Sequence, residues 1–202
     1  MPSIQAGTTD NQIKAANTIA AHQARIEAIR SDPALSPEGK RNRMAGDYIT
    51  TEATVAQLQA DEQAAASARR TTLERDLFGL TGFTDASAAI SYRDAQDRAA
   101  GITDERDALR LLNQADLSGD DHLAKAVALR SIQESWPNVS AAYAAARPGV
   151  AAKMQELANT ATPGIADSLS AAWAYYLPAP NELAGISAQT LNDLAHTDTR
   201  GA

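Results

Sequence analysis

Most of the apolar side chains in this sequence are small, and this limits the interior that the chain can build. Hydrophobic residues make up 44% of the 202 residues, but alanine supplies much of that fraction, and there are only 2 Phe, 2 Trp, 5 Tyr and 3 Met. Alanine is the strongest helix former, and it buries little surface per residue. We therefore predict an all-α fold whose thin core is stabilised by close helix packing and by self-association.

The charge of the chain argues against DNA, RNA or an anionic membrane surface as the main partner. The formal net charge is −7 and the isoelectric point is about 4.9, whereas nucleic acids and anionic membrane surfaces bind clustered Lys and Arg. The basic cluster Lys40, Arg41 and Arg43 lies beside Glu38 and Asp47, which is typical of a solvated helix face. We expect protein partners, with no nucleic acid and no membrane.

Cysteine is absent from the sequence, so disulfides, thiolate catalysis and thiolate metal sites are excluded. Residues 1–9 lack the basic start and the apolar run of a signal peptide, and we expect them to form a disordered leader. No stretch is apolar for long enough to cross a bilayer. We therefore expect a cytoplasmic protein.

Residues 10–78 are expected to form a long, coiled-coil-like helical hairpin. Asp10 is predicted to cap the first helix, and Ser36 to cap a second helix that runs from Pro37 to Phe78. The short connection predicts antiparallel packing. The predicted seam comprises Ile13, Ala16, Ile19, Ala20, Ile26 and Ile29 in the first helix and Met44, Tyr48, Val55 and Leu58 in the second.

A compact bundle of short helices is expected over residues 79–178. The Phe78, Leu80 and Phe83 side chains are predicted to pack into the core at the base of this bundle, next to a glycine-rich break. A helical repeat of the tetratricopeptide kind is the alternative, but no fixed period recurs. Residues 179–202 are expected to be a tail with a short helix at 187–195. Breaks at Gly and Pro, with Thr103 and Asp120 as N-caps, predict bundle helices at about 85–100, 104–117, 120–135, 137–146, 148–160 and 164–176.

The sequence predicts no metal site and no cofactor. Residues 116–121 look superficially like a calcium loop, but the glycine and glutamate of an EF-hand are out of place, so a helix–glycine–helix turn capped by Asp120 is expected. His22, His122 and His196 lie in separate regions without the spacing of helical metal sites. We expect structural roles for these histidines.

Asp94 and Asp97 lie in the most polar predicted helix. Their spacing from Arg98 and Arg93 predicts intrahelical ion pairs. A general acid and base is the alternative role for the two carboxylates, which would make the chain a small enzyme. The sequence contains no nucleophile motif or phosphate loop, so we expect no catalytic residues and no enzyme.

Two groups of apolar residues are candidates for protein–protein contacts. Trp173 and Tyr176 close the most apolar helix end and could form either core or a docking patch. The hairpin candidates could instead be purely intramolecular core; they are Ile19, Ile26, Met44, Val55 and Leu58.

Two stretches resemble a family of actinobacterial phage and prophage proteins from the structural gene region near the portal and the major capsid protein. The first runs from Arg25 to Arg41; the second comprises Ser91–Ala99, Leu111-Leu112, Gly119–Ala126, Trp136 and Tyr143. The resemblance implies a role in virion morphogenesis as a scaffold, minor capsid component or connector. It also implies capsid or portal partners and a place in the host cytoplasm or in the virion.

Two functional hypotheses follow from the sequence. The first is a non-enzymatic phage assembly or structural protein that self-associates and contacts capsid or portal through helices. The second is a helical adaptor that binds a protein or peptide in a groove of the C-terminal bundle. An assembly protein is expected to oligomerise alone, whereas an adaptor stays monomeric until its ligand arrives.

Overall fold

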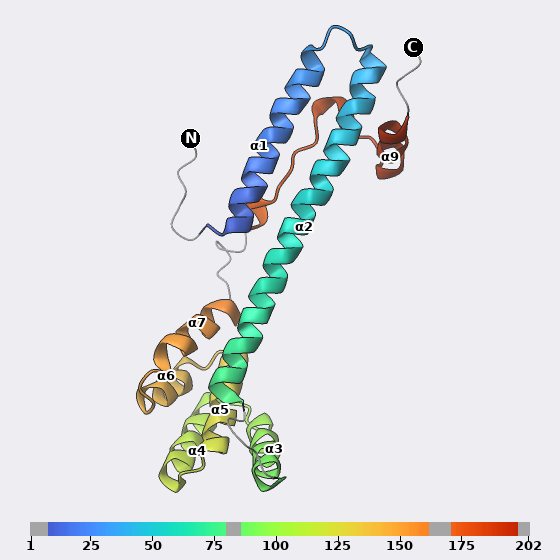
Figure 1. Cartoon of the computed structure of the whole chain (residues 1–202). Coiled ribbons are helices and arrows are strands. Elements are labelled where there is room, and N and C mark those ends of the chain that lie inside the picture. Colours follow the sequence, from blue (N-terminus) through green and yellow to red (C-terminus); the bar gives the residue numbers. More distant parts are fainter. Residues whose placement is uncertain (1–7, 80–85, 162–170, 198–202) are drawn as a thin grey trace. The chain divides into compact units, whose positions relative to one another are not determined.

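The computed structural model describes residues 8–79, 86–161 and 171–197 (Figure 1). No strand occurs in these ranges, which confirms the all-α prediction. Contacts divide the chain into unit 1, Met1–Ala64 with Gly164–Ala202, and unit 2, Ala65–Pro163. The elements are α1 (Asp10–Ser31), α2 (Pro37–Phe78), α3 (Ala86–Ala100), α4 (Glu105–Ser118), α5 (Asp121–Gln133), α6 (Pro137–Ala145), α7 (Ala151–Ala161), the 3-10 helix η1 (Asn181–Leu183) and α9 (Ala188–His196). Residues 171–174 are also helical.

The two units differ from the predicted segments, whose boundaries lay after residues 78 and 178. Leu73 and Leu77 of α2 belong to the core of unit 2 rather than to the hairpin. Tyr175 and Leu183 pack on the hairpin, so the chain returns to unit 1 after unit 2 is complete. The difference arises because burial of these side chains depends on neighbours that are far away in the sequence.

Side-chain caps fix the helix ends close to the predicted positions. Thr9, not Asp10, caps α1, because a Thr-x-x-Gln capping box gives two reciprocal hydrogen bonds: Gln12 N donates to Thr9 Oγ1 at 3.2 Å and Thr9 N to Gln12 Oε1 at 3.1 Å. Ser36 caps α2 as predicted, with a hydrogen bond of 3.1 Å from Gly39 N. The cap of α4 is Asp104 rather than Thr103, since its carboxylate accepts from Asp107 N at 2.9 Å.

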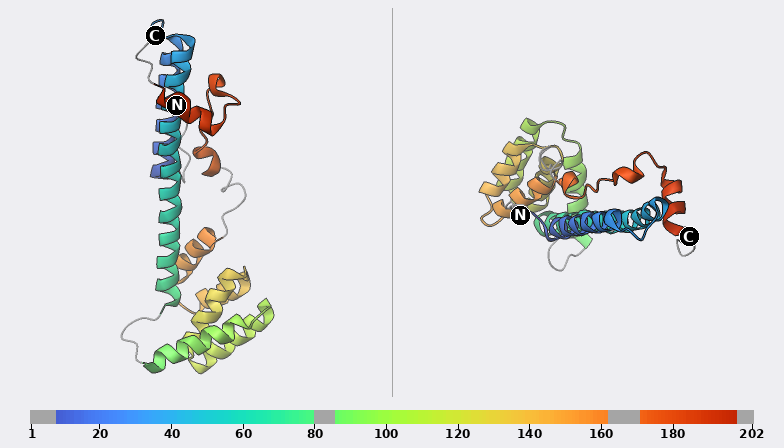
Figure 2. Two further views of the ribbon diagram at one scale, coloured as in Figure 1. Left: turned by 90° about the vertical axis from the view of Figure 1, so that its right-hand side faces the viewer. Right: turned by 90° about the horizontal axis from the view of Figure 1, so that it is seen from above.

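The helices α1 and α2 run antiparallel and pack along a heptad seam (Figures 1 and 2). The predicted stripe was wrong at Ala16 and Ala20, which are exposed. Spacings of four and three residues alternate in both helices, and this repeat keeps one face of each helix against its partner. The seam positions are Ala15, Ile19, His22, Ile26 and Ile29 in α1 and Met44, Tyr48, Thr51, Val55 and Leu58 in α2.

The core of unit 2 is organised around α5, which contacts α3, α4, α6 and α7. Ala126 and Ala128 are two positions apart, and therefore on nearly opposite sides of this helix, and both are buried. This is expected for a helix that is surrounded by others. Phe78 is 2% exposed and packs against Tyr143 with ring centroids 6.2 Å apart, which confirms its predicted place in the base of the bundle. Leu80 and Phe83 lie outside the described residues.

The C-terminal part of unit 1 is held to the hairpin at Tyr175. Its side chain is 9% exposed, and its hydroxyl donates to the Glu62 carboxylate at 2.5 Å. The same carboxylate accepts from Thr9 Oγ1 and from Gln12 Nε2. Burial, followed by the hydrogen bond to Glu62, raises the pKa of Tyr175 to about 12.

We predict that truncation of Leu112 to Ala strongly destabilises unit 2. Leu112 is fully buried on α4, so the substitution leaves a cavity and is expected to cost about 2 to 5 kcal/mol of unfolding free energy. The control is Leu117→Ala on the same helix, where the side chain is 90% exposed and the change should stay within about 0.5 kcal/mol. Urea denaturation followed by circular dichroism measures both; equal losses would contradict the assigned core.

We also predict an alkaline loss of stability that depends on Tyr175. The tyrosine of the unfolded chain ionises near pH 10, whereas the folded one keeps its proton to about pH 12. The stabilisation is therefore complete below pH 10 and is lost as the pH rises to 12, by about 1 to 3 kcal/mol. Denaturation curves at pH 9 and 11.5 should show a smaller pH effect in Tyr175→Phe than in the wild type. The same effect in both proteins would argue against this contact.

Candidate functional site

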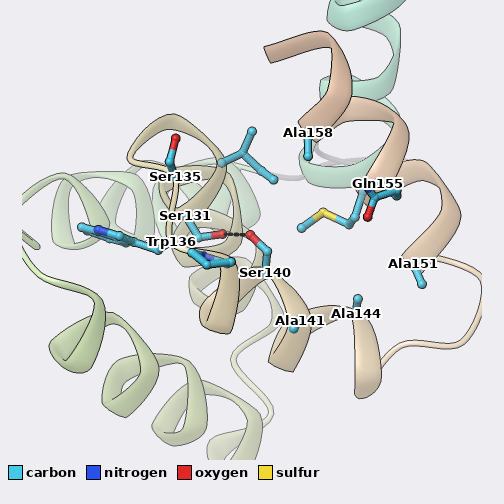
Figure 3. Close-up of a pocket in the computed structure, with 12 residues that line it drawn as sticks. Ser131, Ser135, Trp136, Ser140, Ala141, Ala144, Ala151, Gln155 and Ala158 are labelled. Atoms are coloured by element: carbon cyan, nitrogen blue, oxygen red, sulfur yellow. Dashed lines mark hydrogen bonds between the residues drawn. The ribbon is translucent and has the colours of Figure 1, made fainter. Parts of the chain in front are cut away.

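An apolar groove of about 570 Å³ lies between α5, α6 and α7 in unit 2 (Figure 3). Three parts of unit 2 line it: the end of α5 with the turn after it, α6, and α7. Most of the lining side chains are small or apolar. They are Ser131, Ile132, Ser135, Trp136, Pro137, Ser140, Ala141, Ala144, Ala151, Met154, Gln155 and Ala158.

Alanines give the groove its width. Ala141 and Ala144 are three residues apart on α6, and Ala151, Gln155 and Ala158 follow spacings of four and three on α7. Residues at these spacings share one face of a helix. α6 therefore presents short side chains to the groove, and α7 presents alanines on both sides of Met154 and Gln155, so that the side chains of another helix can enter between them.

Hydroxyl groups provide the polar atoms of the groove. Ser131 is 1% exposed, and its Oγ lies 2.7 Å from Ser140 Oγ and donates to the Ala128 carbonyl at 2.7 Å (Figure 3). A hydroxyl carries one proton and two lone pairs. The Ser140 hydroxyl is only partly buried, so a bound ligand could hydrogen-bond to it.

The backbone of Ser135 is strained at the edge of the groove. Its φ of 58° is the one positive value among the described residues other than glycine. The conformation lets Trp136 N donate to the Ser131 carbonyl at 2.8 Å and turns the chain from α5 into α6. Ser135 N also donates to the Ile132 carbonyl at 3.4 Å, so the two hydrogen bonds form a Schellman motif that ends α5. A residue with a Cβ costs about 1 to 2 kcal/mol in this conformation.

Two ion pairs hold α7 against the end of α2 inside unit 2. Arg69 forms a bidentate ion pair with Glu156, in which Nε and Nη2 donate to the two carboxylate oxygens at 2.7 and 2.9 Å. Lys153 Nζ lies 3.0 Å from Asp76 Oδ2. The hydrogen bond from the Arg69 guanidinium lowers the pKa of the Glu156 carboxyl. These contacts position the α7 wall of the groove.

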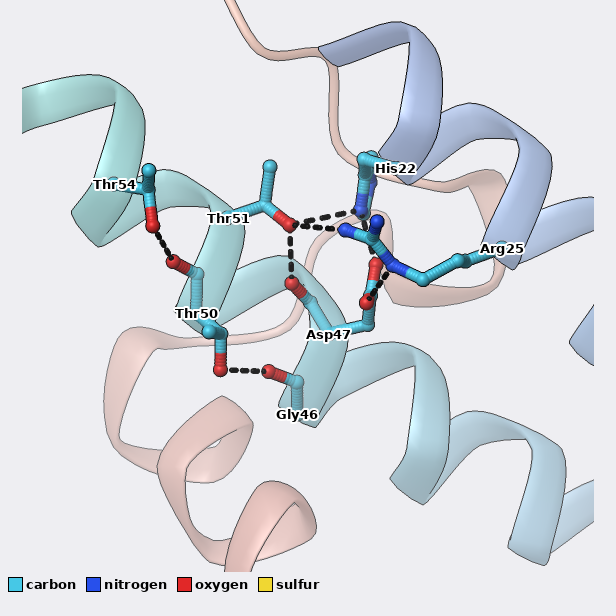
Figure 4. A network of polar contacts seen from close by, with 7 residues as sticks. All are labelled: His22, Arg25, Gly46, Asp47, Thr50, Thr51 and Thr54. Atoms are coloured by element: carbon cyan, nitrogen blue, oxygen red, sulfur yellow. Dashed lines mark hydrogen bonds and ion pairs between the residues drawn. The ribbon is translucent and has the colours of Figure 1, made fainter. Parts of the chain in front are cut away.

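Unit 1 contains a buried polar network that the sequence analysis did not predict (Figure 4). His22 is 2% exposed, and its Nδ1 lies 2.5 Å from Asp47 Oδ2. Arg25 donates from Nε to the other Asp47 oxygen at 2.5 Å and from Nη2 to Thr51 Oγ1 at 3.2 Å. The Thr51 hydroxyl donates to the Asp47 carbonyl at 2.7 Å.

The geometry of this network fits a structural role rather than catalysis. Thr51 Oγ1 and the Asp47 carboxylate both approach the same imidazole nitrogen of His22, at 3.3 and 2.5 Å. A catalytic triad needs the hydroxyl and the carboxylate on opposite nitrogens. The heptad frame was the available signal, because it places His22 and Thr51 in the seam, where polar side chains fix the register of paired helices.

The predicted interaction residues of the hairpin lie inside unit 1. Ile26, Met44 and Val55 are 5%, 1% and 3% exposed, and Ile19 and Leu58 are half-buried beside them. In this conformation they are intramolecular core, the alternative that the sequence left open. Ile26, Met44 and Val55 are therefore not accessible to another chain, and Ile19 and Leu58 are accessible only in part.

Trp173 and Tyr176, by contrast, form an exposed aromatic pair. They are 67% and 57% exposed, and their rings meet edge-on with centroids 5.2 Å apart. Tyr175, between them in sequence, is buried in the hairpin. A core position for Trp173 was the other expectation, and the structure contradicts it because the buried face of this helix end carries Tyr175.

Two other predicted polar features lie in α3 and in the turn between α4 and α5. Asp94 is exposed and lies 4.0 Å from Arg98, whereas the described residues include no ion pair between Arg93 and Asp97. Gly119 ends α4 with a φ of 71°, and the Asp120 carboxylate accepts from Leu123 N at 3.0 Å, which confirms the predicted turn.

A search of the described part of the chain finds no cluster of three or more His, Cys, Asp or Glu residues that could hold a metal ion. Nor does this part contain a helix with the length and apolar character needed to span a membrane.

Comparisons with protein-family models, curated proteins and solved structures gave no match. The apolar groove and the exposed aromatic pair are surfaces of the described residues that a partner could contact.

We predict that Asp47→Ala destabilises unit 1. The substitution leaves the buried His22 Nδ1 and the Arg25 guanidinium without their carboxylate and is expected to cost about 1 to 3 kcal/mol. Asp61→Ala, at an exposed position of the same helix, is the matched control and should change stability by less than about 0.5 kcal/mol. Thermal and urea unfolding provide the comparison, and a control loss as large as that of Asp47→Ala would rule out the special role of the network.

Proposed function

We propose that this chain is a non-enzymatic structural protein of phage virion assembly that binds a protein partner through the groove of unit 2. The partner is a capsid or portal protein that places an amphipathic helix between α6 and α7. The groove is the observation that carries this proposal. The setting in virion assembly comes from the resemblance of Arg25–Arg41 and of the Ser91–Tyr143 region to the phage family.

The chemistry of the groove favours a helix as the occupant. An amphipathic helix binds by placing apolar side chains at spacings of three and four residues into a hydrophobic groove. The rows of small residues on α6 and α7 leave room for such side chains, and Trp136 and Met154 supply larger apolar contacts. The Ser131–Ser140 hydroxyl pair adds a polar contact that fixes the orientation of the occupant.

The burial of the hairpin residues supports partner binding over self-association through the hairpin seam. Met44 and Val55 already contact residues of their own chain, so a second chain could reach them only after unit 1 had opened. The groove of unit 2 needs no such opening, since its lining residues include the exposed Ala141, Ala151 and Gln155. This arrangement also agrees with the adaptor hypothesis, in which the chain binds a protein or peptide in a groove of the C-terminal bundle.

We predict that Ala151→Glu weakens partner binding by about tenfold or more, equivalent to about 1.4 kcal/mol, because it puts a charge into the apolar groove. The control is Ala152→Glu, one residue along α7 and outside the groove lining. Both substitutions add an acid to the first turn of the same helix, so their effects on helix stability should match.

The measurement is calorimetric titration of both variants with the purified capsid and portal proteins of the phage genome that encodes this chain. The control should bind within about twofold of the wild type. If neither virion protein binds the wild type at micromolar concentration, the proposed function is refuted. If both variants bind equally, the contact lies outside the groove.

A further inference from the structure

The hairpin of unit 1 carries a peptide-like segment of its own chain on one face. The segment runs from Tyr175 to His196, orange to red in Figures 1 and 2, and includes η1 and α9. Leu183 is 2% exposed and packs with Ile26 and Met44 of the hairpin. The half-buried Ile186, Leu191 and Leu194 join the same cluster.

Charge complementarity fixes the position of this segment. Arg30 of α1 donates from Nε and Nη2 to the two carboxylate oxygens of Glu182, at 2.7 and 3.0 Å. A planar guanidinium that meets a carboxylate in this way selects both its partner and the orientation. Farther along, the Tyr175 hydroxyl donates to Glu62 at 2.5 Å. The contacts are thus spread along the hairpin.

The segment binds the hairpin in the manner of a separate ligand. Residues 176–180 are not helical and include two prolines, and a short amphipathic helix, α9, follows after η1. Side chains of the segment contact the hairpin, and residues 65–163, which form unit 2, separate the segment along the sequence from the part of α2 that belongs to unit 1. The hairpin face therefore has the form of a receptor for an extended peptide that carries one carboxylate and is followed by an amphipathic helix.

We propose that this face also receives the Tyr175–His196 segment of a second copy of the chain, so that two copies exchange their segments reciprocally. A second copy offers the same apolar residues and the same Glu182 carboxylate to Arg30. Exchange of an identical element conserves every contact of the closed chain, and it is a low-cost route to dimers. The surface lies in unit 1 and is independent of the groove in unit 2.

Site-specific crosslinking tests the exchange, because the native chain has no cysteine. Full-length Arg30→Cys and full-length Glu182→Cys, carrying different tags, are coexpressed, purified together and treated with a short bismaleimide. A crosslinked dimer that contains both tags, at a yield about tenfold above the control, is expected. In the control, Leu117→Cys, exposed on α4 in unit 2, replaces Arg30→Cys.

Charge-reversal variants of Arg30 and Glu182 give a second and separate test of the segment exchange. Arg30→Glu alone and Glu182→Arg alone place like charges together within one chain. In a mixed dimer, each hairpin meets a segment of opposite charge. Coexpression of the two variants should give a dimer by light scattering, whereas each single variant expressed alone should stay monomeric. The double variant Arg30→Glu with Glu182→Arg restores opposite charges on the hairpin and the segment and should have the same mass as the wild type.

The results separate exchange from a purely internal contact. Mixed-tag crosslinks together with the charge-dependent dimer support exchange. If Arg30→Cys with Glu182→Cys in one chain crosslinks only internally and the coexpressed pair gives no more dimer than the control, the proposal is overturned. It is equally overturned if the double-cysteine chain gives neither an internal nor an interchain crosslink, because the segment then does not lie on this face.

Discussion

The use of alanine as a core residue is the constraint on which both units depend. Ala108, Ala124 and Ala128 are fully buried in unit 2, and Ala15 and Ala45 are fully buried in unit 1. The short side chain lets helices pack closely and costs no rotamer entropy on burial. It also buries little apolar area, so each helix needs several neighbours, as α5 has in unit 2.

The same property shapes the candidate functional site. Where α6 and α7 carry Ala141, Ala144, Ala151 and Ala158, their short side chains leave a groove rather than a filled interface. The strained backbone at Ser135 and the ion pair between Arg69 and Glu156 hold two of its sides in place. A surface of small residues on fixed helices suits recognition of another helix, which connects the composition of the chain to the proposed binding role.

Polar contacts supply the specificity that alanine lacks in unit 1. A seam of small and medium apolar residues can slip in register, whereas buried polar groups must meet their partners. His22, Asp47 and Thr51 meet across the hairpin, and Arg30 meets Glu182 of the returning segment. The first group sets the register of α1 against α2. The second selects the segment that covers the hairpin.

The sequence by itself determined the all-α class and the course of the helices, including α2 from Pro37 to Phe78, because caps, prolines and glycines act within a few residues. It missed the network at His22 and the burial of Tyr175 between the exposed Trp173 and Tyr176. It predicted a groove in the bundle only as a hypothesis and named none of its lining residues. Those features were decided by the tertiary structure, because burial and pairing depend on residues that packing brings together from distant parts of the chain.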